Sequence, residues 1–123
     1  MGERRLRALR GATTVTADDA EQIVAATVEL LDEMMARNEV AHDDLVSMIF
    51  TTTPDLHAEF PALGARKAGM SDIPLLCSQE IDVPGAVERC IRLLVHLYTD
   101  RDRSSLRHVY LGDARQLRTD LPE

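Results

Sequence analysis

One segment of this chain has a clear helical period, and any fold of the chain must accommodate it. Apolar and small side chains recur there at spacings of three and four residues, with charged residues between them. The residues of this stripe are Ile23, Thr27, Leu30, Leu31 and Met34. Thr16, followed three positions later by Asp19, resembles a capping box and predicts the start of a helix that ends near Asn38. We interpret the methionines of this helix as core residues rather than metal ligands.

Period-two patterns and β-branched residues on both sides of this segment predict strands. The clearest pattern covers residues 46–52 and ends before Pro54. The other predicted strands are residues 4–15, 73–81 and 107–111. Residues 55–71 contain proline and glycine without a sustained period, so we expect a loop with one or two helical turns. Residues 88–99 remain open, because their leucines fit a buried helix as well as a central strand.

The length and charge of the chain limit the classes of function. With 123 residues we expect one domain, residues 1–123, and a site of any size would need walls from a second subunit. The formal charge is −7, and no short run concentrates lysine and arginine. Nucleic acid and acidic membranes are therefore excluded as partners.

The sequence also predicts a protein of the cytoplasm. Its longest apolar stretch, residues 91–98, is far shorter than the ~20 residues that span a bilayer. The first ten residues are basic, but no apolar segment follows them as in a secretory signal. Cys77 and Cys90 match neither a redox pair nor a zinc site, so we expect reduced thiols and no metal.

Charged residues interrupt an otherwise apolar region at CSQEIDVPGAVERCIR, residues 77–92. Arg92 lies between Ile91 and Leu93, where an unpaired guanidinium would be costly to bury. We expect it to pair with Glu80 or Asp82. Thirteen of the 14 basic residues are arginine, which grips carboxylates with two parallel hydrogen bonds, although genome-wide base composition is the better explanation for most of them.

Several motifs in order resemble one known family. They are RGATTV (residues 10–15), TPDLHAEFPALGAR (53–66), CSQEIDVPG (77–85), CIR (90–92), RHVYL (107–111) and LRTDL (117–121). In this order and spacing they resemble the AroH class of monofunctional chorismate mutases, over most of the chain. The resemblance implies an α+β fold in which a mixed β-sheet packs on one long helix, and residues 88–99 form a strand. It also implies a homotrimer with a pseudo-α/β-barrel core.

The implied function is the rearrangement of chorismate, a dianion, to prephenate. The reaction breaks an ether C–O bond while a C–C bond forms in the same molecule, so we expect no cofactor. By resemblance, Arg92 stabilises negative charge on the ether oxygen. Glu80 and Cys77 resemble the partners of the substrate ring hydroxyl and of the Arg92 guanidinium. Arg10 resembles a carboxylate-binding residue, and Tyr110 a phenol that hydrogen-bonds the same ligand.

Further residues resemble the walls of a site between subunits. Phe60 would be an apolar wall and Arg66 a second carboxylate clamp, both from the neighbouring subunit. Leu117 and Arg118 would close over the site. Gly64, next to the position where the family often has lysine, predicts a flexible loop.

Two histidines could act as bases, and two other functions are open alternatives. His57 and His108 are interpreted as structural, because the rearrangement moves no proton. Cys90 is assigned to the core. A RidA-like imine deaminase, which also binds a carboxylate by arginine in a subunit cleft, lacks support from CSQE and RHVYL. A trimeric carboxylate sensor would keep the same arginines without turnover.

Overall fold

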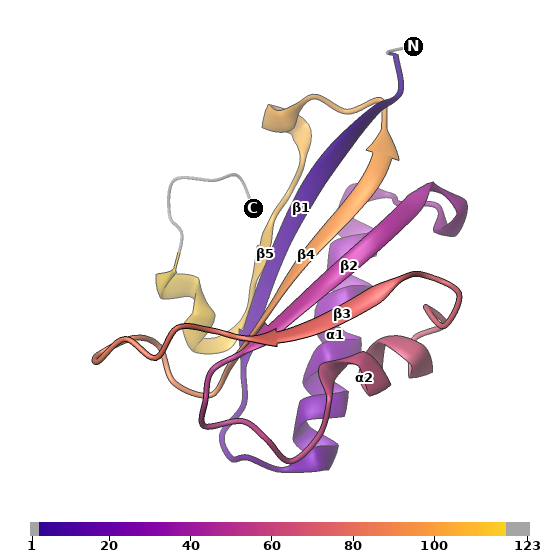
Figure 1. Ribbon diagram of the computed structural model, residues 1–123. Coiled ribbons are helices and arrows are strands. Elements are labelled where there is room, and N and C mark those ends of the chain that lie inside the picture. The colour runs from indigo at the N-terminus through magenta and orange to yellow at the C-terminus, as the bar shows by residue number, and fades with distance from the viewer. Residues whose placement is uncertain (1–2, 118–123) are drawn as a thin grey trace.

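A five-stranded mixed sheet forms the centre of the computed structural model, which describes residues 3–117 (Figure 1). The strands are β1 (Arg5–Thr14), β2 (Leu45–Thr52), β3 (Leu75–Gln79), β4 (Cys90–Thr99) and β5 (Val109–Tyr110). Their order is β3-β2-β4-β1-β5; β4 is antiparallel to both of its neighbours, and the two edge strands are parallel to theirs. The predicted α+β architecture is confirmed, and residues 88–99 do contain a strand.

Both α-helices lie on one face of the sheet, behind the strands in Figure 1. They are α1 (Ala20–Asn38) and α2 (Pro61–Lys67), and short 3-10 turns occupy His42–Asp44, Arg103–Ser105 and Gly112–Gln116 (η1, η2 and η3). The predicted stripe of α1 is buried against the sheet in full. Its N-cap is Asp19, whose carboxylate accepts the N–H of Gln22 at 3.0 Å, so the prediction that Thr16 caps this helix was wrong.

The helix α2 approaches α1 very closely, and a glycine allows this contact. A Cβ added to Gly64 would lie 2.7 Å from Cβ of Thr27 and 3.0 Å from the carbonyl oxygen of Val24. Gly64 is buried and helical. It therefore serves close packing between two helices, and the prediction of a flexible loop at this position was wrong.

Strand β4 explains how charged residues fit into an apolar segment. Ile91, Leu93 and Val95 face the helices and are buried. Arg92 and Leu94 point to the opposite face of the sheet, because successive side chains of a strand alternate. The two faces of β4 therefore differ, because the residues that face the helices are apolar and the opposite face carries Arg92. The apolar residues explain why this segment also fitted a buried helix in the sequence.

The face of the sheet opposite the helices is largely uncovered in the part of the chain that the structure describes. The turn η3 packs on one end of it, through a small cluster of Ala12, Cys90, Tyr110 and Ala114. Elsewhere large apolar side chains stay exposed: Leu6 by 52%, Leu76 by 62% and Tyr98 by 48%. We call this surface the open face. Apolar exposure of this kind on a sheet marks a contact surface.

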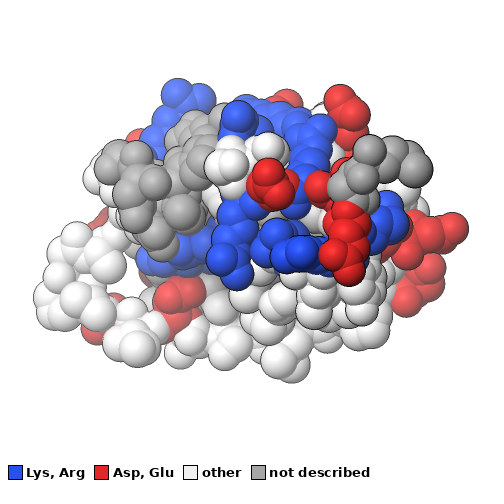
Figure 2. All heavy atoms as spheres, turned by 90° about the horizontal axis from the view of Figure 1, so that it is seen from above, with Lys and Arg blue, Asp and Glu red and all other residues white. Residues whose placement is uncertain are grey.

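Basic residues gather at the end of the sheet where β1 begins and β4 ends, although the chain is acidic overall. Figure 2 looks onto the molecule from above, and a band of lysine and arginine side chains crosses this view, with acidic residues among them. Two of these arginines are neutralised locally: Arg4 pairs with Asp44, and Arg101 lies 3.7 Å from Glu39. Among residues 3–117, no helix has the length and apolar character needed to cross a membrane.

Candidate active site

Glu80 is held beside β2 although it follows the end of β3. Its backbone N–H donates to the carbonyl oxygen of Thr52 at 2.9 Å, which continues the parallel pairing of the two strands by one residue. The hydroxyl of Thr51 donates to the Glu80 carboxylate. Thr51 is also the partner of Arg92 in the β2–β4 register, so backbone pairing brings the carboxylate and the guanidinium together.

The ion pair between Arg92 and Glu80 is long. Arg92 Nε lies 3.7 Å from Glu80 Oε2, and the two side chains are 29% and 27% exposed. A direct charge-assisted hydrogen bond would be about 2.8 Å. Arg92 Nε is buried and has no hydrogen-bond partner among residues 3–117. The guanidinium is therefore positioned by Glu80 rather than saturated by it, and it keeps donors for a ligand.

A cavity of about 450 Å³ opens on this pair at the open face. Its lining includes Arg10, Ala12, Thr51, Glu80, Arg92 and Tyr110. Arg10 and Tyr110 come from β1 and β5, and parallel pairing places Tyr110 beside Ala12. The backbone N–H of Arg10 donates to Nδ1 of His108 at 3.0 Å, which confirms His108 as a structural residue. Four of the predicted site residues thus share one cleft.

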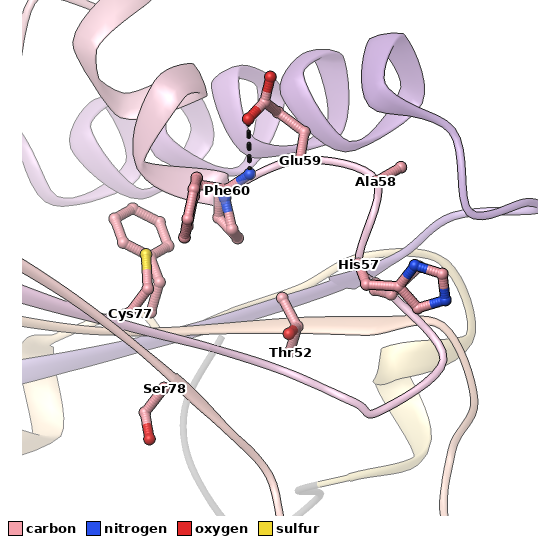
Figure 3. A pocket seen from close by; sticks show the side chains of 10 residues that line it. Thr52, His57, Ala58, Glu59, Phe60, Cys77 and Ser78 are labelled. Carbon is pink, nitrogen blue, oxygen red and sulfur yellow. Dashed lines mark hydrogen bonds between the residues drawn. The ribbon is translucent and has the colours of Figure 1, made fainter.

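Cys77 does not belong to this cleft within a single chain. It pairs with Phe50 in the β2–β3 register and therefore faces the helices, whereas Glu80, three positions later, lies on the open face. Figure 3 shows Cys77 directed toward the helices and Ser78 directed the opposite way. The predicted contact of Cys77 with the Arg92 guanidinium is absent among the described residues, so any role of Cys77 at that cleft would require a second copy of the chain.

Phe60 and Cys77 line a different cavity, of about 340 Å³, between β3 and the start of α2 (Figure 3). Phe60 is 67% exposed, which is unusual for a phenylalanine with no covering element. The two cavities lie on opposite sides of the sheet. The structure thus groups the predicted residues into two half-sites: Arg10, Glu80, Arg92 and Tyr110 in one, Phe60 and Cys77 in the other.

The loop before Phe60 is fastened to the turn between β1 and α1. Asp18 accepts the backbone N–H groups of His57 and Ala58 at 3.0 and 2.9 Å, and its carboxylate lies 3.2 Å from Nδ1 of the His57 ring. Partial burial acts to raise the pKa of Asp18, but the two N–H bonds and the His57 charge outweigh it and lower the pKa below its ordinary value. The ring of His57 thus takes part in a structural contact, as predicted.

The remaining predicted residues are placed as follows. Arg66 is exposed in the last turn of α2 and is not among the residues that line either half-site. Leu117 packs against the small cluster beneath η3. Arg118 lies outside the described residues.

Cys90 is fully buried, and burial raises the pKa of its thiol to about 11, while the charge of Arg92 acts in the other direction. Cys90 is a core residue, as predicted.

Two residues that hold the site were missed in the sequence. Thr51 and Asp18 act through partners 29 and 39 or more residues away, so no local pattern marks them. The sequence held one sign for Thr51. It alternates with the apolar residues of the 46–52 pattern, which places it on the other face of that strand. Together the residues of the first half-site offer two guanidinium groups, a carboxylate and a phenol around an open cavity, which defines a site for an anionic ligand.

Comparisons with known proteins agree with this description. The profile of the family described as chorismate mutase type I matches residues 6–121. Chorismate mutase AroH of Bacillus subtilis is 42% identical over 117 residues, covering 94% of this chain and 92% of that protein. Chorismate mutase AroH of Thermus thermophilus is 45% identical, covering 94% and 96%.

A solved structure gives the same result. The chorismate mutase of Clostridium thermocellum has a TM-score of 0.88 and 50% identity, covering 90% of this chain and 99% of that one. The chain therefore belongs to the type I chorismate mutase family. Both the resemblance seen in the sequence and the function predicted from it are confirmed.

Proposed function

We propose that this protein, an isomerase, rearranges chorismate to prephenate in a cleft between subunits, with Arg92 as the residue that stabilises the transition state. The observation that carries this proposal is the long Arg92–Glu80 pair. An arginine whose Nε is buried, yet which has no hydrogen bond from that atom to residues 3–117, is prepared to donate to an anionic group in the cavity. The family to which the chain belongs supports the choice of substrate.

The reaction requires the protein only to hold the substrate in a folded shape and to stabilise the charge that develops. The substrate folds so that its enolpyruvyl carbon reaches the ring, the ether C–O bond breaks, and the C–C bond forms without a nucleophile or a proton transfer. No cofactor is required for this step. Negative charge grows on the ether oxygen, and a fixed cation in a partly dry cleft stabilises it by about 3 kcal/mol or more, the range of a preorganised donor.

Glu80 and Thr51 keep the cation in position. The Thr51 hydroxyl occupies one carboxylate oxygen of Glu80, and the same oxygen is the one nearest to Arg92. The carboxylate also offsets the desolvation of the guanidinium and can accept the ring hydroxyl of the substrate. Arg10 binds a substrate carboxylate, and Tyr110 hydrogen-bonds the same ligand.

The second half-site is supplied by a neighbouring copy in a homotrimer. The open face exposes Leu6, Leu76 and Tyr98, and a barrel-like core built from three such faces would cover them. Phe60 and Cys77 face away from Arg92 in their own chain, so a neighbour would present them. Arg66 of that neighbour would add the second carboxylate clamp, and Leu117 and Arg118 would close the cleft. Residues 1–123 form a single domain in this proposal, and its place in the cytoplasm stays a prediction.

The test is loss of chorismate absorbance on addition of purified protein without metal or cofactor. Wild type should turn over chorismate to prephenate. Arg92→Ala, and the neutral isostere citrulline at position 92, should lose at least about a hundredfold in kcat, the value of one preorganised donor. Arg37→Ala, which removes a surface pair with Glu33, should keep full activity.

Three results would overturn the proposal. If the citrulline variant kept wild-type kcat, the charge at position 92 would not act in the transition state. If wild type gave no prephenate while chorismate still raised its melting temperature, the protein would be a carboxylate sensor. Release of ammonia from imine substrates would point to the deaminase instead.

A further inference from the structure

The start of β4 is held by side chains as well as by the backbone ladder of the sheet. In an antiparallel hydrogen-bonded pair, two opposed residues normally exchange both of their N–H···O=C bonds. Arg89 continues the β1–β4 pairing opposite Val15, whose N–H donates to the carbonyl oxygen of Arg89 at 3.0 Å. The return bond differs, because the carbonyl oxygen of Val15 accepts from Nε of the Arg89 side chain at 3.2 Å. A side-chain donor thus takes the place of a backbone N–H.

The same substitution occurs on the other side of β4. Thr53 and Cys90 continue the β2–β4 pairing beyond Thr52 and Ile91, and the N–H of Thr53 donates to the carbonyl oxygen of Cys90 at 3.0 Å. The N–H of Cys90 donates to the hydroxyl oxygen of Thr53 at 2.9 Å. Side chains therefore complete both ladders of β4 at the end from which Arg92 follows.

One carboxylate connects these two side-chain contacts. Oδ2 of Asp55 accepts the backbone N–H of Arg89 at 2.9 Å, and the hydroxyl of Thr53 donates to Oδ1 of the same carboxylate. Asp55 therefore binds the N–H that would otherwise pair with Val15. It also orients the hydroxyl that accepts from Cys90.

Arg89 has an uncommon backbone conformation at this point. Its φ is +47°, in the left-handed region, where a residue with a Cβ atom is strained. Such strain persists only where surrounding bonds hold it. Asp55 holds the N–H of Arg89, and Val15 holds its carbonyl oxygen and its Nε.

Arg92 is the third residue of β4, so its position depends on this end of the strand. Backbone pairing with Ala12 and Thr51 places it at the cleft. We propose that Asp55 is a positioning residue for Arg92, which acts by holding the strained backbone of Arg89 and with it the start of β4. The effect on turnover rests on the proposed function, whereas the effect on β4 does not.

Asp55 should act on kcat more than on KM. It belongs to the loop that leads to Phe60, but this loop has other anchors: Leu56 is only 5% exposed, and Asp18 accepts two of the backbone N–H groups of the loop. The apolar wall of the second half-site should therefore stay in place without Asp55. A displacement of Arg92 by about 1 Å can by itself lower the rate about a hundredfold.

The first test compares two substitutions of Asp55. Asp55→Ala removes both acceptors and should lower kcat at least about tenfold, with a smaller change in KM. Asp55→Asn should keep most of the activity, because its amide oxygen can accept from Arg89 and its amide N–H can donate to the Thr53 hydroxyl. Asp32→Ala, at an exposed position of α1, should match wild type. Equal loss in Asp55→Asn and Asp55→Ala would mean that charge acts rather than hydrogen bonding, and would overturn the proposal.

A second variant tests the strain. Glycine adopts the left-handed conformation without strain. The double variant Asp55→Ala/Arg89→Gly should therefore fold even if Asp55→Ala does not, and it should recover part of the lost kcat. Arg89→Gly with Asp55 intact measures the cost of losing the bond from Nε to Val15. A double variant with no more activity than Asp55→Ala would show that Asp55 does not act through the strained backbone.

A third measurement needs no turnover. Amide hydrogen exchange, followed by mass spectrometry on a peptide that contains residues 88–92, should be faster in Asp55→Ala than in wild type, with α1 unchanged. Unchanged exchange would overturn the proposal, as would faster exchange with wild-type kcat, which would leave Asp55 a structural residue only. If wild type itself gives no prephenate, the proposed function fails, and the exchange result alone decides whether Asp55 holds the start of β4.

Discussion

Glu80 lies 3.7 Å from Arg92 and shares its nearer carboxylate oxygen with the hydroxyl of Thr51. The Glu80 carboxylate is thus held by the Thr51 hydroxyl and stays at a distance from the Arg92 guanidinium. This separates two tasks that a direct salt bridge would combine: Glu80 sets the position and charge balance of the guanidinium, and the guanidinium keeps hydrogen-bonding capacity for a ligand.

Thr51 should therefore act as a positioning residue. Thr51→Val keeps the shape of the side chain but removes the donor to Glu80, so the carboxylate can turn toward Arg92 and saturate it. We expect kcat to fall about tenfold, in line with a hydrogen bond to a charged group, with a smaller change in KM. Thr51→Ser should restore activity, since it retains the hydroxyl. A Val variant with wild-type kcat would show that this hydrogen bond does not position the pair.

Gly64 should be required for the contact between α1 and α2. Gly64→Ala places a methyl group 2.7 Å from Cβ of Thr27, and overpacking of this kind destabilises by about 1–3 kcal/mol. A flexible loop would respond in the opposite way, because alanine reduces the entropy of the unfolded chain. The measurement is the free energy of unfolding in urea. Thr27→Gly, which removes Cβ itself, should recover part of the loss in the Gly64→Ala background, and additive effects of the two changes would argue against a direct clash.

The sequence predicted the elements of the fold better than their ends. Periodicity was sufficient for α1 and β2 because each has one buried side. For β4 it was not, since its helix-facing residues and Leu94 are all apolar, and the choice between helix and strand came from the family resemblance. The last strand was predicted as residues 107–111 but is only Val109–Tyr110, because it pairs with β1 over two residues.

The candidate site shows a similar division. The sequence left two partners open for Arg92, and the parallel register of β2 and β3 decides for Glu80. Period two alone could have separated Cys77 from Glu80, since residues three apart on a strand face opposite ways. Thr51 and Asp18 could not be predicted, because their partners are brought close only by the complete fold.

The two thiols should differ sharply in reactivity. The thiolate is the reactive form, and burial raises the pKa of Cys90 to about 11, so this thiol should resist alkylation by iodoacetamide at pH 8. Cys77 is partly exposed and should be the residue labelled in the native protein. Mass spectrometry of the labelled peptides checks this. Cys77→Ser should abolish native labelling, and both cysteines should react in urea; labelling of native Cys90 would mean that the cluster beneath η3 opens readily.

Asp18 should make the loop before Phe60 sensitive to acid. Its pKa is lowered in the folded state, so its contribution to stability is complete above the unfolded value near 3.8 and is lost as pH falls through the folded value. We expect Asp18→Ala to lower the melting temperature at pH 7 and to raise the KM for chorismate with little change in kcat, because the N–H groups of His57 and Ala58 lose their acceptor. The difference in melting temperature from wild type should shrink as the pH falls below the unfolded value near 3.8 and disappear once Asp18 of the folded wild type is protonated. Asp32→Ala, an exposed carboxylate on α1, serves as the control and should show no such dependence. A constant difference between Asp18→Ala and wild type across this range would mean that the side chain matters for packing and not for its charge.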